Sequence, residues 1–331
     1  MKKTEIITLC CAGFFGTNRA LSELERNTGL TRHFVVDGLD KDSLDVKFYL
    51  ELIKEDKPRL LIFGGWNDLY RVFMNALSGR GISFGVYWTS SPGQTGITPE
   101  MDKLAFILRA SGIQYKLFSS AEFAGLLARE GWETRYLPMT LDVERYAAHD
   151  TSGNKGPLTL SMFCSPFDYG RKNVLNCLLA LSSVRKKYVL HLNGLSKNKY
   201  YKAIMKSLNI NYVEHGWMHA NKYELILDKI DVGIQVTFAE TFNYVAAEHM
   251  AKGIPVIASR MVRVMDDMPS GVFKRTVVDN VDNAFEIMEK VDRLMSSPEE
   301  RRALGKKMCS ALKKGNRERI RIAGETLKGI R

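Results

Sequence analysis

The fold is decided by the stretch Ile230-Asp-Val-Gly-Ile-Gln-Val-Thr-Phe-Ala-Glu240, which continues as Thr-Phe-Asn-Tyr-Val-Ala-Ala-Glu248 and His-Met-Ala-Lys-Gly-Ile-Pro-Val-Ile-Ala-Ser259. Residues 231–238 form a short apolar run rich in β-branched side chains, which predicts a buried parallel strand. Residues 241–252 place apolar side chains at helical spacing, and Gly253 is suited to end that helix. Pro255 then opens a strand over residues 256–259. The stretch therefore predicts a strand, a tight turn, a helix and a second strand, which is a βαβ unit.

The turn between that strand and that helix is where we expect the chemistry. A helix N-terminus presents unpaired N–H groups and the positive end of a dipole, which suits a phosphate. Glu240 stands at this end, and its charge favours hydroxyl groups as its partners. Glu248 lies about 12 Å further along the helix axis. A nucleotide diphosphate sugar spans a similar length, so one glutamate can hold the sugar and the other the ribose, while the amides of Thr241, Phe242 and Asn243 bind the diphosphate.

These residues resemble the signature of the retaining GT-B glycosyltransferases, in the large family four group. That signature is a glutamate, seven residues, a second glutamate, and then a helix end of the form small-Gly-Ile/Val-Pro-Val-Ile. Glu240, Glu248 and residues 251–259 match it, whereas Asn243 stands where relatives usually have glycine. An ordinary surface helix with two exposed glutamates also fits the glutamate spacing alone. The strand before the helix and the Lys-Gly-Ile-Pro after it favour the family.

Composition sets the broad class of the protein. The chain has 331 residues, of which 45% are hydrophobic and 26% charged, so it is globular and long enough for two domains. Its five cysteines lack metal-ligand spacing, which favours reduced thiols in a cytoplasmic protein. No stretch approaches ~20 apolar residues, so we expect no transmembrane segment. The N-terminus lacks the cleavage site of a signal peptide.

The net charge of +11 is unevenly distributed. Residues 301–331 hold eleven Lys or Arg against two Glu, a difference of +9. A basic face favours an anionic acceptor or surface, either a membrane or DNA. A solvated helix face is the third interpretation, and charge alone does not choose among them.

The domain boundaries follow from composition and from the resemblance. We expect an N-terminal Rossmann-like acceptor domain over residues 1–148, and a linker over residues 149–157, which read His-Asp-Thr-Ser-Gly-Asn-Lys-Gly-Pro. Residues 158–310 are expected to form a C-terminal Rossmann-like nucleotide-sugar domain. A basic helix over residues 311–331 would cross back to the first domain, as in GT-B proteins. We expect the final helical region, which opens at Pro298, to be interrupted near Gly315 and Asn316.

The first domain offers candidate contacts where its predicted strands end. Strands are expected at residues 6–11, 33–36, 59–63 and 82–88. By resemblance, the glycine-containing turn after the first strand lies under the donor phosphates and sugar, which points to Gly16. The polar loops after the third and fourth strands offer Trp66, Ser91 and Gln94 as acceptor contacts. Asp40 and Asp42 fit a metal-binding Asp-x-Asp pattern, but helix capping explains them better, so no metal site is predicted.

The second domain carries an adjacent basic pair, Arg171 and Lys172, at the start of a predicted helix. Two cations there oppose the helix dipole unless an anion is bound, which predicts a clamp on the donor diphosphate. Relatives have an arginine soon after the strand and a lysine at the helix. Lys172 matches the lysine, whereas Ser165 occupies the arginine's place, and Arg171 is the candidate substitute for that arginine. The family also places the turn at His215 and Gly216 beside the nucleotide base.

We therefore predict an α/β protein of GT-B fold, with two Rossmann-like domains facing each other across a cleft. The resemblance implies a retaining, metal-independent hexosyl- or pentosyltransferase that needs no cofactor beyond a nucleotide sugar, with a UDP-sugar as first choice. Glu240, Lys172 and Arg171 are the catalytic candidates. The expected acceptor is a surface glycan or lipid-linked sugar at the inner membrane surface, and hydroxymethylated DNA is the alternative. The spacing of the two glutamates argues against a GT-B epimerase, and missing motifs argue against a non-enzymatic nucleic-acid-binding protein.

Overall fold

A computed structural model describes residues 5–37, 43–97, 100–146, 157–164 and 168–330. The chain divides into two compact units, unit 1 (Met1–Asp142 and Asn316–Arg331) and unit 2 (Val143–Gly315). The linker predicted at residues 149–157, apart from Pro157, lies outside the described residues, as do Asp40, Asp42 and Ser165. None of the helices in the described ranges combines the length and apolar character that a membrane-spanning segment requires.

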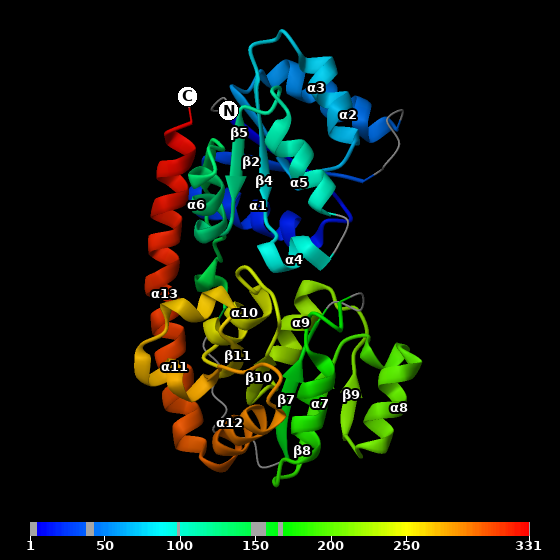
Figure 1. The fold of residues 1–331 in the computed structure, drawn as a ribbon, viewed down its shortest axis with the longest axis vertical. Coiled ribbons are helices and arrows are strands. Elements are labelled where there is room, and N and C mark those ends of the chain that lie inside the picture. Colours follow the sequence, from blue (N-terminus) through cyan, green and yellow to red (C-terminus); the bar gives the residue numbers. More distant parts are fainter. Residues whose placement is uncertain (1–4, 38–42, 98–99, 147–156, 165–167, 331) are drawn as a thin grey trace. The chain divides into compact units, whose positions relative to one another are not determined.

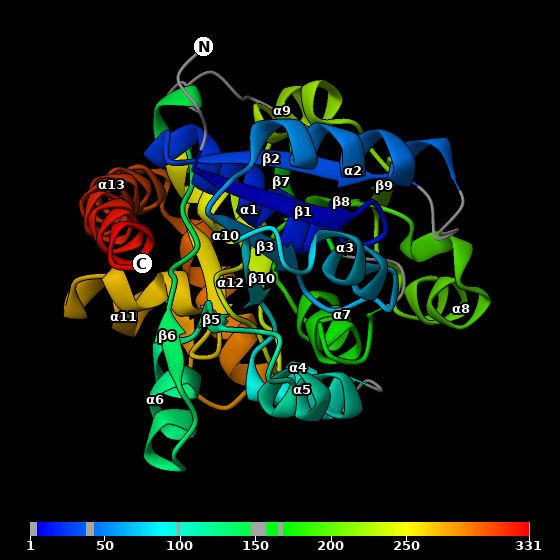
Figure 2. The ribbon, with the colours of Figure 1, turned by 90° about the horizontal axis from the view of Figure 1, so that it is seen from above.

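Unit 1 is built on a six-stranded parallel sheet with the strand order β2-β1-β3-β4-β5-β6. Its strands are β1 (Ile6–Cys11), β2 (Thr31–Val36), β3 (Leu60–Gly64), β4 (Ser83–Trp88), β5 (Tyr115–Phe118) and β6 (Thr134–Tyr136). The helices between them are α1 (Phe15–Thr28), α2 (Leu44–Asp56), α3 (Leu69–Leu77), α4 (Pro92–Ile97), α5 (Glu100–Arg109) and α6 (Ala121–Arg129). Figure 2 shows β2, β1 and β3 side by side. The four strands expected in this half of the sequence are confirmed.

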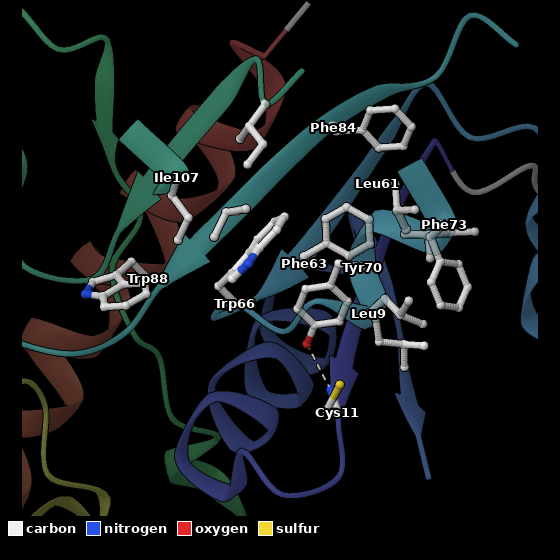
Figure 3. Packing of buried hydrophobic residues seen from close by; sticks show 14 of the residues in the cluster. Leu9, Cys11, Leu61, Phe63, Trp66, Tyr70, Phe73, Phe84, Trp88 and Ile107 are labelled. Atoms are coloured by element: carbon white, nitrogen blue, oxygen red, sulfur yellow. Dashed lines mark hydrogen bonds between the residues drawn. The ribbon is translucent and has the colours of Figure 1, made fainter. Parts of the chain in front are cut away.

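The core of unit 1 ties the ends of its central strands together (Figure 3). Tyr70 of α3 stacks on Phe63, with ring centroids 4.6 Å apart. Its hydroxyl accepts a hydrogen bond from the Cys11 amide (3.1 Å) and donates one to the Gly64 carbonyl (3.0 Å). The Cys11 amide and the Gly64 carbonyl lie at the ends of β1 and β3. The buried Tyr70 hydroxyl therefore gives both backbone groups a hydrogen-bond partner outside the sheet.

Unit 2 contains a second six-stranded parallel sheet, with the order β12-β11-β10-β7-β8-β9. Its strands are β7 (Leu158–Met162), β8 (Tyr188–Leu192), β9 (Tyr212–Glu214), β10 (Val232–Gln235), β11 (Val256–Ser259) and β12 (Val277–Val278). The helices are α7 (Val174–Ser182), α8 (Lys199–Ser207), α9 (Ala220–Leu227), α10 (Tyr244–Ala251), α11 (Ser270–Thr276) and α12 (Ala284–Ser296). Helix α13 (Pro298–Lys328) begins in unit 2 and belongs to unit 1 from Asn316 onward. In Figure 1, α8 lies outside β9, the edge strand.

The βαβ unit that the sequence predicts is confirmed as β10, α10 and β11. Both strands are buried along their whole length, which agrees with their continuous apolar sequence. Strand β10 is shorter than predicted, because residues 236–243 form the loop that leads into the helix. Gly253 adopts a φ of 78° just after α10, in the left-handed region that favours glycine at a helix end.

Helix α13 corrects the prediction of an interruption near Gly315 and Asn316, because it is continuous from Pro298 to Lys328. Asn316 is 4% exposed, and its side-chain amide both donates to the Leu141 carbonyl (2.6 Å) and accepts from the Leu141 amide (3.0 Å). An asparagine side chain usually weakens a helix because it bonds to nearby backbone groups. The Asn316 side chain bonds to Leu141 instead, so the helix continues through it. A β-carbon at position 315 would collide with the carboxylate of Asp267, so a larger residue there would have to displace that side chain.

Gly305 is expected to be essential for the packing of α13 in unit 2. A β-carbon there would collide with the carbonyl oxygen of Gly253, whereas one at Gly324 in the same helix would meet nothing within 4 Å. We expect Gly305→Ala to lower the melting temperature by several degrees. Gly324→Ala should leave it unchanged or raise it, since alanine is favoured over glycine in helices by about 1 kcal/mol. Thermal unfolding of both variants checks this, and equal melting temperatures would contradict the packing.

Candidate active site

The loop between β10 and α10 is shaped by Asn243. This residue has a φ of 64°, in the left-handed region that asparagine tolerates better than other non-glycine residues. Its side-chain oxygen accepts from the Ala246 amide (3.0 Å) and so caps the helix. Its side-chain nitrogen donates to Gln235 at the end of β10 (3.1 Å). Asparagine therefore supplies the backbone conformation for which glycine is suited, and adds two hydrogen bonds that fix the helix start.

Glu240 lies in that loop and is buried, with 8% of the residue exposed. One of its carboxylate oxygens accepts from the Arg171 guanidinium (2.8 Å) and from the Lys172 ammonium. Burial alone would raise the pKa of Glu240, but the charges of Lys172 and Arg171 outweigh it and hold that pKa below its ordinary value. The structure thus brings together the three residues that the sequence proposes as catalytic, as one ion cluster.

Arg171 joins the loop after β7 to the loop after β10. Its guanidinium donates to Asp168, to the Ala239 carbonyl and to Glu240. Its own carbonyl accepts from the Phe238 amide (2.9 Å) and from the Thr237 hydroxyl (2.9 Å). The Arg171 side chain is 9% exposed and is directed at protein groups. Arg171 therefore fixes the loop that carries Glu240.

Lys172 lies beside a pocket in unit 2. The pocket is small, with a volume of about 10 Å³, which is room for about one water molecule. Besides Lys172 it is lined by Met162, Phe163, Cys164, Cys177, Ile234, Gln235, Val236 and Thr237. These residues come from the ends of β7 and β10 and the segments that follow them, and from α7. In a parallel sheet such ends are where ligands bind.

Glu248 lies in α10 and is 5% exposed, so neither signature glutamate lies on an exposed surface helix. One of its carboxylate oxygens accepts a hydrogen bond from the hydroxyl of Tyr146 (3.0 Å). A carboxylate is strongly hydrated in water, so its burial requires polar partners in the protein. The Tyr146 hydroxyl is one of them.

His215 and Gly216 lie in a loop that is fixed by Glu214. The Glu214 carboxylate accepts from the amides of Gly216 (3.1 Å), Ser196 (3.0 Å) and Gly194. His215 Nε2 lies 2.9 Å from His191 Nδ1. Burial lowers the pKa of His191 to about 4 and also lowers that of His215, so both rings are neutral at pH 7. A nucleotide base at this turn would meet two neutral imidazoles.

The unit 1 candidates have structural contacts of their own. Gly16 lies in the first turn of α1 and not in the turn before it, and a β-carbon there would meet nothing within 4 Å. Ser91 and Gln94 bond reciprocally at the start of α4, since each backbone amide donates to the other's side-chain oxygen. Trp66 is 3% exposed and packs against Tyr70 and Phe106 in the core. The proposed ligand contacts of these residues stay predictions, and Trp66 offers little surface for one.

Sequence reasoning missed three residues that support the site. Asp168 pairs with Arg171, Glu214 organises the loops after β8 and β9, and Tyr146 bonds to Glu248. The spacing of Asp168 three residues before Arg171 is a weak signal for a local ion pair, and nothing in the sequence marks Tyr146. Within the described part of the chain, no group of three or more His, Cys, Asp or Glu side chains is placed to hold a metal.

Comparison with known proteins shows what the chain is similar to. Residues 163–309 match the family model of glycosyl transferases group 1. No curated protein sequence matches the chain. Among solved structures, the sucrose-phosphate synthase of Thermosynechococcus elongatus has a TM-score of 0.74 at 15% identity, with 98% of each chain covered.

Two further structures are similar over nearly their whole length. The Anabaena protein HepE, in complex with UDP and glucose, has a TM-score of 0.74 at 12% identity, with 98% of each chain covered. The lipopolysaccharide outer core galactosyltransferase WaaB has a TM-score of 0.60 at 14% identity, with 96% of this chain and 99% of WaaB covered. Likeness at this identity establishes the fold, and it confirms the prediction of the GT-B fold class.

The Glu240 ion cluster should make stability depend on acidity. Since the pKa of Glu240 is lowered in the folded protein, its contribution to stability is complete above the ordinary glutamate pKa and is lost as pH falls through the lowered value. At pH 7 we expect Glu240→Gln to cost about 3 kcal/mol, because it leaves buried cations without their anion. The difference from the wild type should narrow as pH falls below the ordinary glutamate pKa, which thermal unfolding measures.

The matched control for this experiment is Glu318→Gln, since the Glu318 carboxylate also pairs with an arginine, Arg321, but at the surface of α13. Solvent screening leaves such a pair little stabilising effect, so this variant should follow the wild type at every pH. A constant difference between Glu240→Gln and the wild type across the acid range would show that the cluster is not the source of the effect.

Proposed function

We propose that the chain, whose residues 163–309 match the family model of glycosyl transferases group 1, moves a sugar from a nucleotide diphosphate sugar to an acceptor hydroxyl with retention of anomeric configuration. The observation that carries this proposal is the meeting of Glu240 with Lys172 at the loop before α10, with Glu248 further along the same helix. Unit 2 thereby supplies a cation for the diphosphate and two carboxylates for hydroxyl groups.

Each residue of the donor site has a distinct part in the proposed reaction. Lys172 binds the diphosphate and neutralises the charge that develops as the nucleotide leaves. The amides of Thr241, Phe242 and Asn243, at the positive end of α10, bind the same group. Glu240 orients the sugar and stabilises its positive character in the transition state. Arg171 acts through Glu240, because its guanidinium already bonds to that carboxylate and to Asp168.

The nucleotide has its own contacts in this proposal. Glu248 accepts hydrogen bonds from the ribose hydroxyls, and the turn at His215 and Gly216 lies beside the base. UDP is the first choice of nucleotide, since the similar protein HepE was solved with UDP and with UDP-glucose. Incubation with a panel of UDP-, GDP- and ADP-sugars, followed by detection of the released nucleoside diphosphate, tests the function. Release from none of them would contradict it.

The acceptor is proposed to be a surface-glycan or lipid-linked sugar, bound at the cytoplasmic face of a membrane. The similarity to WaaB, a lipopolysaccharide galactosyltransferase, supports this choice. Exposed cations along α13 also support it, among them Lys306, Lys307, Lys314 and Arg317. The same charges favour hydroxymethylated DNA as the second candidate acceptor. Ser91 and Gln94 remain proposed acceptor contacts in unit 1.

Lys172→Ala is expected to weaken binding of UDP much more than binding of uridine, since the proposed partner of Lys172 is phosphate. A charge-assisted contact of this kind contributes about 1.5–3 kcal/mol, which is a loss of roughly 10- to 150-fold in affinity. Isothermal titration with both ligands measures this. The control is Lys252→Ala, since Lys252 is also a buried lysine of unit 2 but pairs with Asp228. Equal losses for UDP and uridine would contradict the phosphate contact.

The basic surface of α13 is expected to make acceptor binding depend on salt. Affinity for an anionic surface should fall steeply as salt rises, in proportion to the number of phosphates neutralised. Binding of UDP should change much less, because buried charges are less screened. Binding to anionic vesicles and to hydroxymethylated duplex DNA, from low to moderate salt, checks this. Preference for vesicles supports the glycan or lipid acceptor, preference for DNA supports the second candidate, and binding to neither contradicts both.

A further inference from the structure

Three consecutive side chains at the start of unit 2 reach three different helices. Glu144 pairs with Lys313 of α13 (3.2 Å), Arg145 pairs with Glu224 of α9, and Tyr146 donates a hydrogen bond to Glu248 of α10 (3.0 Å). The three follow one another through a 3-10 turn (Val143–Arg145), in which the Tyr146 amide donates to the Val143 carbonyl (3.2 Å). Val143, which is 4% exposed, anchors the turn independently of the Tyr146 side chain, whereas the two partly exposed ion pairs add little stability.

The contact between Tyr146 and Glu248 is buried on both sides, since each residue is 5% exposed. A hydrogen bond to an ionised acceptor is shorter and stronger than one between neutral groups, and burial strengthens it further. The terminal torsion of a glutamate has a broad minimum, so a carboxylate has no preferred orientation without directional partners. The phenol, itself held by the anchored turn, supplies such a direction.

The choice of partner distinguishes Tyr146 from two partly buried tyrosines of unit 2. The hydroxyl of Tyr188 donates to the Leu181 carbonyl (2.8 Å), and that of Tyr169 donates to the Gly194 carbonyl (3.0 Å). These are ordinary bonds to the backbone, which a tyrosine makes to satisfy its own hydroxyl. Tyr146 donates instead to the side chain to which the proposed function assigns the ribose.

We infer that Tyr146 is a positioning residue that orients the Glu248 carboxylate toward the ribose hydroxyls of the donor, and so sets the preference of the enzyme for ribonucleotides over deoxyribonucleotides. This inference rests on the proposed function, and it adds a residue from outside α10 to the donor site. Tyr146 makes no contact with the ligand itself. Its effect is the orientation of a carboxylate that does, and the buried Val143 holds the turn from which the Tyr146 side chain projects.

The test is the affinity of Tyr146→Phe for UDP, 2′-deoxy-UDP and 3′-deoxy-UDP, measured by isothermal titration. The wild type should prefer UDP to at least one deoxy ligand by roughly tenfold or more, since a site built to bond a hydroxyl rejects the analogue that lacks it. Tyr146→Phe should reduce this preference several-fold, with little change in affinity for the deoxy ligand. Tyr188→Phe, which also removes a hydrogen-bonded hydroxyl, should keep the wild-type preference.

A purely structural role would give a different pattern. Tyr146→Phe would then weaken UDP and the deoxy ligands equally, or lower only the melting temperature, and either result would overturn the inference. In a Glu248→Ala background, Tyr146→Phe should change the preference no further, because the two residues act as a unit. If Tyr146→Phe reduced the preference in the Glu248→Ala background as much as it does in the wild type, the inference would also be overturned.

A second variant guards against a folding defect in Tyr146→Phe. Glu248→Asp keeps the charge but shortens the side chain by one methylene group, so it should lose the bond to Tyr146 and the same ribose preference. An unchanged preference in this variant would overturn the inference. If the wild type binds UDP without discriminating against either deoxy ligand, the ribose assignment fails and the proposed transfer stands. If the wild type binds no nucleoside diphosphate, the proposed function itself fails.

Discussion

The carboxylate of Glu240, enclosed between Arg171 and Lys172, is the interaction on which the rest of the site depends. A buried carboxylate is costly, and the two cations offset that cost because both lie within ion-pair distance of the same oxygen. Arg171 extends the cluster to Asp168 and to the backbone of the loop after β10. One ion cluster therefore satisfies the buried charge and joins the two loops that form the site.

Helix α10 gives the site its second half. Asn243 fixes the start of the helix through its left-handed backbone, its cap on Ala246 and its bond to Gln235. From that fixed start, the helical rise determines how far Glu248 lies from Glu240. The spacing of the two carboxylates is thus a property of the backbone. The hydrogen bond from Tyr146 then limits the rotation of the Glu248 carboxylate. A donor with hydroxyl groups on both sides of a diphosphate suits this spacing.

The sequence predicted the features that depend on local order along the chain. The apolar runs, Gly253 and Pro255 were enough for the βαβ unit, because strand and helix periodicity and helix-end chemistry are local. Parallel strands end at one edge of a sheet, so the sequence could predict that Lys172 and Glu240 lie near each other. It could not predict that they form an ion pair. The burial of both glutamates was not predictable, since polar residues on a helix usually face solvent.

Tertiary contacts explain what the sequence did not predict. Asn316 normally disfavours a helix interior, but its bonds to Leu141 allow α13 to continue. Arg171 was expected to meet phosphate, whereas its guanidinium is engaged by Asp168, Ala239 and Glu240. Trp66 was expected at a binding surface and lies in the core. In each case the deciding partner is distant in sequence or lies in a loop without periodicity.

The role of Glu240 is tested most directly by the transfer rate and UDP affinity of Glu240→Gln, measured at a temperature at which this variant is folded. We expect UDP to bind at least as tightly as to the wild type, because Lys172 no longer shares its charge with a carboxylate. Turnover should fall by about 100-fold or more, since the negative charge beside the reacting sugar is lost. Turnover at the wild-type rate, or loss of UDP binding together with turnover, would contradict the assignment of Glu240 to the sugar.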